Sequence, residues 1–130
     1  MKHFLLMIAL IVFMGTHLRS AEKPICRVAA ISSPYITTLS AKELGERSWM
    51  AQIAPAGLER SIALANALKP DAMIVLGSLT WTGSDDDFLR VKKLLSRIEA
   101  PLYVVPGAKD LIDGKDDIFL KHFAKENVAG

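Results

Sequence analysis

The sequence predicts an α/β fold in which three parallel strands alternate with helices in the order βαβαβ. Three short apolar runs carry this prediction, at residues 25–32, 72–76 and 102–105, because each has the length of a strand and each stops at a proline or glycine. Longer segments with apolar residues at helical spacing separate the runs. Since crossovers between parallel strands are right-handed, we expect the three strands to be neighbours in one sheet.

The first strand and the first helix have local signals. The strand, Ile25–Ser32, is apolar and partly β-branched, and it stops at a Ser-Pro pair. Ser40 and Glu43 have the spacing of a capping box, in which each residue satisfies a backbone N–H of the other. This pair predicts a first helix that runs to about Ala51.

A second helix is predicted to begin at Pro55, since a proline sacrifices no hydrogen bond in the first helical turn. It is predicted to end at Lys69 and Pro70. The second strand, Ala72–Leu76, is apolar throughout, as is typical of a strand buried on both faces of a parallel sheet. The predicted apolar stripe of the helix consists of Leu58, Ile62, Ala65 and Leu68.

A third helix is predicted from about Asp85 to Arg97, before the strand Leu102–Val105. Its first turn is acidic, which could suggest a metal site. Ser84 and Asp87 have the spacing of an N-cap, however, and acids stabilise the positive end of a helix dipole, so we interpret the acids as a helix start. The predicted stripe of this helix consists of Phe88, Val91, Leu95 and Ile98.

A loop with an unusual composition follows each strand at its carboxyl end. The loops occupy residues 31–35, 75–83 and 105–110. In open α/β sheets, binding sites form beyond the carboxyl ends of the strands. We therefore expect the three loops to converge at one edge of the sheet.

The spacing and flanks of these loops resemble the calcineurin-like metallophosphoesterase family over roughly residues 25–125, most specifically from Leu68 to Gly77 and from Val105 to Gly107. The family carries the motifs D-x-H, G-D-x-x-D/N and G-N-H-D/E at these places. The resemblance implies the N-terminal half of an αββα sandwich, because the later histidine motifs would lie beyond Gly130. In active members the motif residues hold two divalent metal ions, which activate a water for phosphoester hydrolysis.

In this chain the family's ligand positions hold other residue types. The Asp and His of the first motif fall on Ser33 and Tyr35, and the two acidic positions of the second fall on Ser78 and Trp81, while the Asn and His of the third fall on Ala108 and Lys109. Only Gly77, Gly107 and Asp110 match the motifs. A serine hydroxyl cannot offset divalent charge, alanine has no donor atom, and a lysine ammonium repels cations. We therefore expect no catalytic residue, no metal and no cofactor.

Three functions remain open after this comparison of positions. The chain could be an exported, catalytically inactive relative of the metallophosphoesterases, or a truncated remnant of one. It could be an active phosphoesterase completed by missing sequence or by a partner chain. It could also be a binding module in which Lys109, Ser33 and Ser78 hold a phosphate-like anion without metal.

The N-terminus has the layout of a secretory signal peptide. A basic start is followed by eleven apolar residues, Phe4–Met14, which are too few for a bilayer core that needs roughly 20. We expect residues 1–21 to be removed, leaving one domain at 22–130 in a secreted or periplasmic protein without stable membrane insertion. An uncleaved anchor is the alternative, because Leu18 and Arg19 fit a cleavage site poorly.

Charge and cysteine content argue against two further classes of protein, those that bind nucleic acid and those held together by disulfides. The chain has 16 basic and 14 acidic residues, and two of the basic ones, Lys2 and Arg19, belong to the leader. The domain is thus nearly neutral, and no nucleic-acid partner is expected. One cysteine, Cys26, excludes an internal disulfide, and we expect it to be a buried thiol of the first strand. His122 is expected on a partly exposed helix surface.

Overall fold

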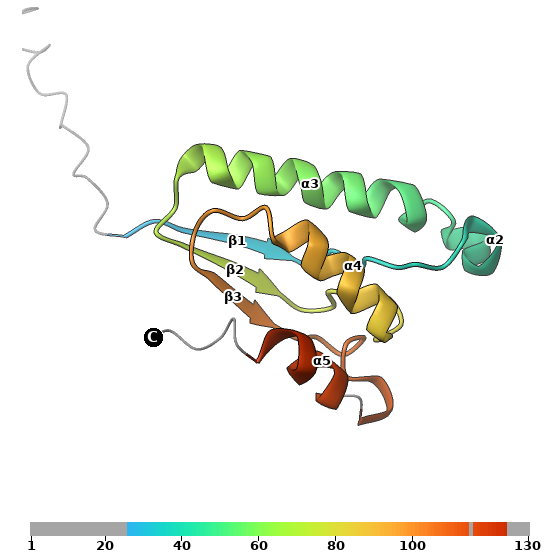
Figure 1. Cartoon of the computed structure of the whole chain (residues 1–130). Coiled ribbons are helices and arrows are strands. Elements are labelled where there is room, and N and C mark those ends of the chain that lie inside the picture. Colours follow the sequence, from blue (N-terminus) through green and yellow to red (C-terminus); the bar gives the residue numbers. More distant parts are fainter. Residues whose placement is uncertain (1–25, 115, 125–130) are drawn as a thin grey trace, which may run out of the picture.

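The computed structural model describes residues 26–114 and 116–124, so the predicted leader lies outside the described residues. Three parallel strands form one sheet in the order β1-β2-β3 (Figure 1). They are β1 (Val28–Ser32), β2 (Ala72–Leu76) and β3 (Leu102–Val105). The mixed α/β class and the parallel sheet of three strands are therefore confirmed.

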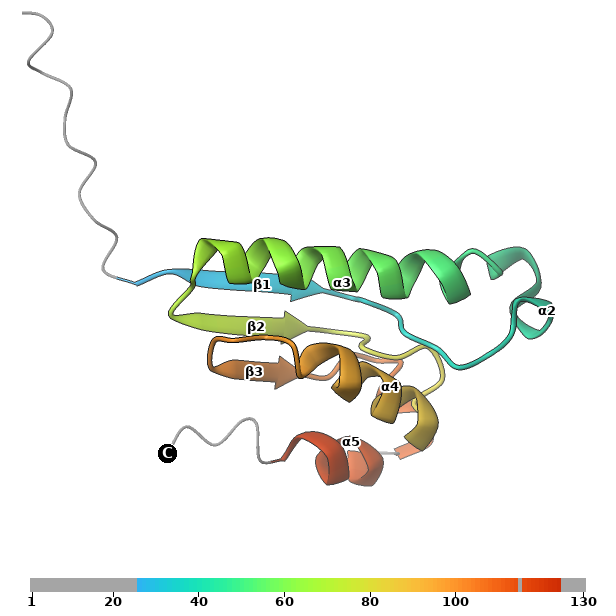
Figure 2. The ribbon, with the colours of Figure 1, turned by 45° about the horizontal axis from the view of Figure 1, so that its top comes forward.

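Four α-helices accompany the sheet in the described part of the chain. They are α2 (Ala41–Leu44), α3 (Met50–Leu68), α4 (Asp85–Leu95) and α5 (Asp116–Phe123). Short 3₁₀ turns also occur, Gly45–Arg47 between α2 and α3 and Ile112–Gly114 between β3 and α5. Figure 2 shows α3 running along β1, with α2 beyond the carboxyl ends of the strands.

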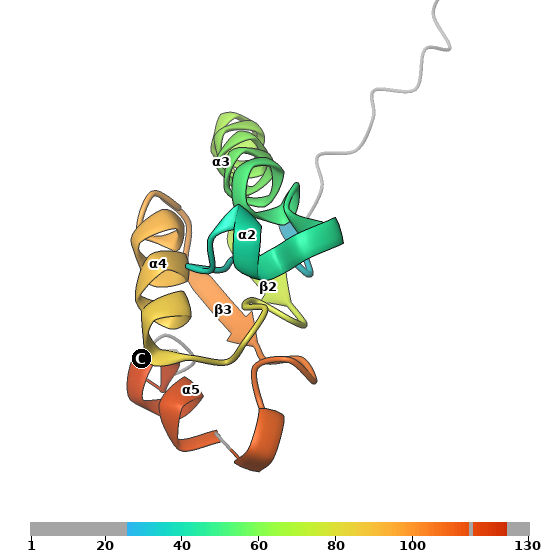
Figure 3. The same ribbon diagram turned by 90° about the vertical axis from the view of Figure 1, so that its right-hand side faces the viewer.

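The two crossover helices cover the same face of the sheet. The strand order follows the chain order, and right-handed crossovers then place α3 and α4 on one side (Figure 3). A single core lies between these helices, α5 and the sheet. Its members include Ile36, Leu58, Ile62, Met73, Val75, Leu79, Phe88, Val91, Leu94, Leu95, Val104, Phe119 and Phe123.

The opposite face of the sheet has no helix over it among the described residues. Val28, Leu76 and Val105 are 55%, 39% and 46% exposed, one on each strand. The alternation along β1, half-buried at Ala29 and Ile31 and exposed at the residues between them, follows from the two-residue period of a strand. β2 is thus buried on one face only, and the prediction that it is buried on both was wrong.

The first strand is shorter than predicted. Its pairing begins at Val28, opposite Ala72, so Cys26 precedes the strand. Cys26 is exposed, and the prediction of a buried thiol was wrong. Cys26 and Arg27 come before the position that pairs with Ala72, the first residue of β2, so the strand begins only after them.

The helix boundaries after β1 also differ from the prediction. The Ser40–Glu43 capping box is present, but α2 ends at Leu44, where Gly45 has φ of 55°. Helix α3 then begins at Met50, so Pro55 lies inside it and not at its start. Pro55 cannot donate to the carbonyl of Ala51, a loss that the packing of a long helix outweighs.

Two predicted stripes are largely observed. Leu58, Ile62 and Ala65 of α3 are buried, but Leu68 is exposed because a helix of 3.6 residues per turn places it about 80° from Leu58. Helix α4 ends at Leu95, two residues before the predicted end, with Ile98 beyond it but still packed on the core. No helix in the described ranges is long and apolar enough to cross a membrane.

Candidate functional site

The loops after β1 and β2 lie side by side beyond the strands. The N–H of Ser33 donates to the carbonyl of Leu76 (2.8 Å), and the N–H of Tyr35 donates to that of Ser78 (3.1 Å). The parallel pairing therefore continues into the loops. Ser33 and Tyr35 have φ of 48° and 50°, which is costly for residues with a side chain and holds the first loop in an unusual shape.

The loop after β3 joins them through close backbone contact. A Cβ atom on Gly107 would lie 2.1 Å from the backbone nitrogen of Ser78, so only glycine fits there. Gly77 has φ of 67°, the left-handed conformation that glycine adopts without strain. The three loops thus converge at the carboxyl edge of the sheet, and both glycines serve that convergence.

A buried carboxylate binds the second loop to the third. Asp110 accepts hydrogen bonds from the N–H of Leu79 (2.9 Å), the N–H and hydroxyl of Thr80 (both 2.8 Å) and the N–H of Gly107 (2.8 Å). Its exposed fraction is 0%. Asp110 therefore positions the loops, and its oxygens are occupied by protein donors.

A second buried carboxylate, Asp87, binds the first loop to the second. Its backbone N–H donates to the hydroxyl of Ser84 (3.2 Å), as the predicted N-cap requires. One carboxylate oxygen accepts from the N–H and hydroxyl of Thr38, and the other accepts from those of Thr82. The sequence predicted the N-cap but not that the Asp87 side chain would join Thr38 to Thr82. That prediction would have required knowing that Thr38 lies beside the start of α4.

Two cationic side chains gather around one indole ring at this edge. The ammonium nitrogen of Lys109 lies 4.4 Å from the centroid of the Trp81 ring, and the guanidinium carbon of Arg47 lies 5.1 Å from it. The Tyr35 ring meets Trp81 edge-on, with centroids 6.0 Å apart. We call these four residues the Trp81 cluster.

Cation–π contacts hold the two positive charges in place without neutralising them. Within the described ranges, no carboxylate forms an ion pair with Lys109 or Arg47. Asp110 follows Lys109 in sequence, but its oxygens are taken up by backbone and hydroxyl donors. The cluster is therefore a place where positive charge is concentrated on an ordered aromatic surface.

The predicted anion ligands are brought together only in part. Lys109 joins the cluster, and Arg47, which no motif indicated, joins it from the 3₁₀ turn before α3. Ser33 is exposed beside Gly77, whereas Ser78 is only 9% exposed. Among the described residues no hydrogen bond joins either serine to Lys109, and the two cations and Trp81 form the centre of the site. Ala108 lies exposed in the turn between Gly107 and Lys109.

Metal-binding side chains do not gather in the part of the chain that the structure describes: no three of its His, Cys, Asp and Glu residues form a group that could hold an ion. The ligand positions of the first loop are a hydroxyl and a phenol, Ser33 and Tyr35. Those of the third loop are Ala108 and Lys109. The side chains that the described residues place at this edge are instead two cations and two aromatic rings.

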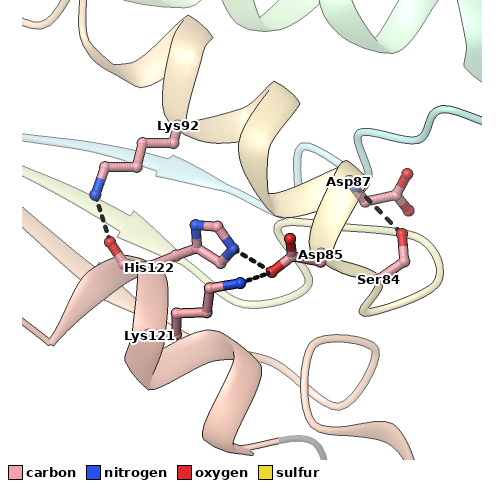
Figure 4. Close-up of polar contacts among 6 residues, drawn as sticks. All are labelled: Ser84, Asp85, Asp87, Lys92, Lys121 and His122. Atoms are coloured by element: carbon pink, nitrogen blue, oxygen red, sulfur yellow. Dashed lines mark hydrogen bonds and ion pairs between the residues drawn. The ribbon is translucent and has the colours of Figure 1, made fainter.

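A separate polar cluster joins α4 to α5 (Figure 4). Asp85 accepts from the ammonium of Lys121 (2.7 Å), and the Nε2 atom of His122 lies 2.8 Å from the same oxygen. Lys121 first, and then His122, lower the pKa of Asp85 through these hydrogen bonds. The Lys92 ammonium donates to the carbonyl of His122 (2.7 Å). These contacts attach α5 to α4, at its start through Asp85 and in its second half through Lys92.

His122 is buried, so its prediction as a partly exposed surface residue was wrong. Its exposed fraction is 7%, and its ring stacks on Phe88 with centroids 5.8 Å apart. The helical pattern around His122 was visible in the sequence. The packing of α5 against α4, which buries this face, was not.

Comparison with known proteins gives no match to a protein-family model and no match to a curated protein. The resemblance to the metallophosphoesterases therefore rests on the sequence alone, on the three loops, their spacing and their flanks.

Proposed function

We propose that the carboxyl edge of the sheet binds a phosphate-like anion without a metal ion. The observation that carries this proposal is the pair of cations, Lys109 and Arg47, held on Trp81 with no carboxylate partner in the described residues. The scaffold is proposed to be similar to the N-terminal half of the metallophosphoesterase sandwich. Export through the leader at residues 1–21 is part of the same proposal.

The chemistry of the two cations suits a phosphate group. A guanidinium offers several N–H donors in a planar fork that matches phosphate oxygens, and an ammonium adds a compact charge. Because both are already placed by Trp81, little side-chain entropy remains to be lost when an anion binds. Lys109 is also half-buried, which strengthens its attraction to an anion relative to a fully solvated lysine.

Binding without hydrolysis follows from the side chains at the ligand positions. Phosphoester hydrolysis by the family's chemistry requires two divalent ions held by carboxylates, imidazoles and an amide. Ser33, Ser78, Ala108 and Lys109 supply none of these groups. In this proposal the chain is a pseudoenzyme that has kept the recognition of the substrate class.

The proposal is tested by titrating inorganic phosphate into the protein with calorimetric detection. Lys109→Met keeps the length of the side chain and removes its charge, and we expect it to weaken binding about tenfold or more, because a charged hydrogen bond contributes roughly 1.5–3 kcal/mol. Lys93→Met, which removes an exposed lysine of α4, is the matched control and should bind as the parent does. Equal affinities in parent and Lys109→Met, or no binding in the parent, would contradict the proposal.

The enzyme alternative has its own readout. An active phosphoesterase would release phosphate from a generic aryl phosphate faster than a metal-only control. We expect no such release from the purified protein. If the protein is purified until its specific activity no longer changes and still releases phosphate, the active phosphoesterase would be favoured over the binding module.

A further inference from the structure

A groove of about 300 Å³ opens next to the Trp81 cluster, between the loop after β1 and helix α3. The loop contributes Ser33 and Tyr35 to its walls. Helix α3 and the residue before it contribute a mostly apolar wall, formed by Trp49, Ile53, Gly57 and Leu58. This volume lies at the small end of the range for sites that bind organic ligands, roughly 300–1,000 Å³.

The groove and the cations share a side chain. Tyr35 lines the groove, and its ring also contacts the ring of Trp81, on which Lys109 and Arg47 lie. The rings of Tyr35 and Trp81 therefore connect this apolar groove to the two positive charges. A ligand that spans both would be an anion attached to an apolar group.

Two large side chains beside the groove are exposed. Trp49 is 54% exposed and Ile53 is 61% exposed, and both line it. Isolated exposed apolar residues are ordinary, but two that border one groove form an apolar surface that water hydrates poorly. An apolar substituent lying in the groove would cover part of both.

Gly57 is the most informative residue of the groove wall. It lies in the interior of α3, where glycine is destabilising relative to alanine. A Cβ atom at this position would meet nothing within 4 Å, so neither packing nor backbone conformation requires glycine. A larger side chain at Gly57 would therefore have room to take up space along the groove.

We infer that the ligand is an organic phosphate monoester whose apolar substituent lies in this groove while its phosphate contacts Lys109 and Arg47. This inference rests on the proposed anion site and narrows its substrate class. The two parts of the ligand have separate roles in this inference: the cations bind the phosphate, and the groove binds the apolar substituent.

The test compares two monoesters with the same head group, methyl phosphate and hexyl phosphate, in calorimetric titrations of the whole protein. The extra methylenes are worth about 0.8 kcal/mol each when fully buried, so even partial burial predicts that hexyl phosphate binds at least about tenfold more tightly. Equal affinities for the two esters would overturn the inference.

Gly57→Leu fills the groove from its own wall and improves helix propensity, so the variant is expected to fold. It should remove the preference for hexyl phosphate and leave the affinity for methyl phosphate within about twofold of the parent's. Ala56→Leu adds the same side chain at the neighbouring exposed position outside the groove, and it should keep the preference. A preference that survives in Gly57→Leu would show that the substituent binds elsewhere.

The possible outcomes distinguish a failure of the groove inference from a failure of the proposed anion site. If both esters bind equally and Lys109→Met weakens both, the anion site stands and the groove has no part in it. If neither ester binds the parent, the anion site itself fails and the inference fails with it. Tight binding of hexyl phosphate that is insensitive to Lys109→Met would overturn the joint site, because the substituent would then act without the cations.

Discussion

Asp110 and Asp87 are buried carboxylates that hold together loops from distant parts of the chain. Each accepts at least one backbone N–H and one threonine hydroxyl. A buried carboxylate is stable only when such donors replace its water. These two residues therefore determine the shape of the carboxyl edge on which Lys109 and Arg47 are presented.

We expect Asp110→Ala to lower the free energy of unfolding by about 3 kcal/mol or more, because three N–H groups and a hydroxyl lose their acceptor. Urea denaturation measures the change. Asp86→Ala removes an exposed carboxylate and should cost less than about 1 kcal/mol. Similar costs for the two variants would show that Asp110 is not a structural centre of the loops.

At the scale of elements, α5 is attached to α4 by an apolar contact and a polar one. Phe119 and Phe123 pack on Phe88, with ring centroids 6.1 Å away in both cases. Asp85, one helical turn before Phe88, adds the hydrogen bonds to Lys121 and His122. The apolar contact supplies burial, and the polar one places α5 relative to the start of α4.

The Asp85 contacts predict a stability change at acid pH. A carboxyl whose pKa is lowered in the folded state stabilises the fold above its unfolded pKa of about 3.9, and this stabilisation is lost as pH falls through the lowered value. The free energy of unfolding of Asp85→Asn should therefore fall less steeply than the parent's below about pH 4. Denaturant unfolding at several pH values measures the slopes.

The control for this comparison is Asp86→Asn, which removes an exposed carboxylate from the same helical turn. It should keep the parent's acid-side slope. If Asp85→Asn and the parent show the same slope, the contacts of Asp85 with Lys121 and His122 do not stabilise the protein in solution.

At the scale of the whole molecule, the most consequential feature is a parallel sheet whose two crossover helices cover one face. Parallel sheets are commonly covered on both faces. Here the strand order β1-β2-β3 puts both crossover helices on the same side, and the other side keeps exposed apolar residues on every strand. The two faces therefore contribute unequally to stability.

Two adjacent residues of β3 test this asymmetry. Val104 is 1% exposed and Val105 is 46% exposed, so they have the same side chain on opposite faces. We expect Val104→Ala to lower the free energy of unfolding by roughly 2 kcal/mol and Val105→Ala by less than about 1 kcal/mol. Denaturant unfolding of both variants at low protein concentration measures these changes. Equal losses of unfolding free energy would mean that the second face is also covered in solution.

Strand and loop positions could be predicted from the sequence because their signals are local. The apolar runs of β2 and β3, the capping box at Ser40 and the N-cap at Ser84 each depend on a few consecutive residues. The convergence of the loops followed from the parallel topology. These features needed no knowledge of which helix contacts which.

The features that the sequence did not predict depend on tertiary contacts, which a local sequence pattern does not indicate. His122 is buried because α5 packs on α4, and Pro55 lies inside α3 because the packing of the helix outweighs a lost hydrogen bond. Arg47 reaches Trp81 only because the turn before α3 returns to the carboxyl edge. Of the two cations at the centre of the site, the sequence therefore predicted only Lys109.

The most direct test of the central claim is whether phosphate binds in the absence of metal. Inorganic phosphate is titrated into the protein after treatment with EDTA and removal of the chelator, and again in the presence of Mn²⁺. The account predicts the same affinity in both titrations, because Lys109 and Arg47 supply the positive charge. Binding that appears only when Mn²⁺ is added would contradict it and would show that this edge is a metal centre.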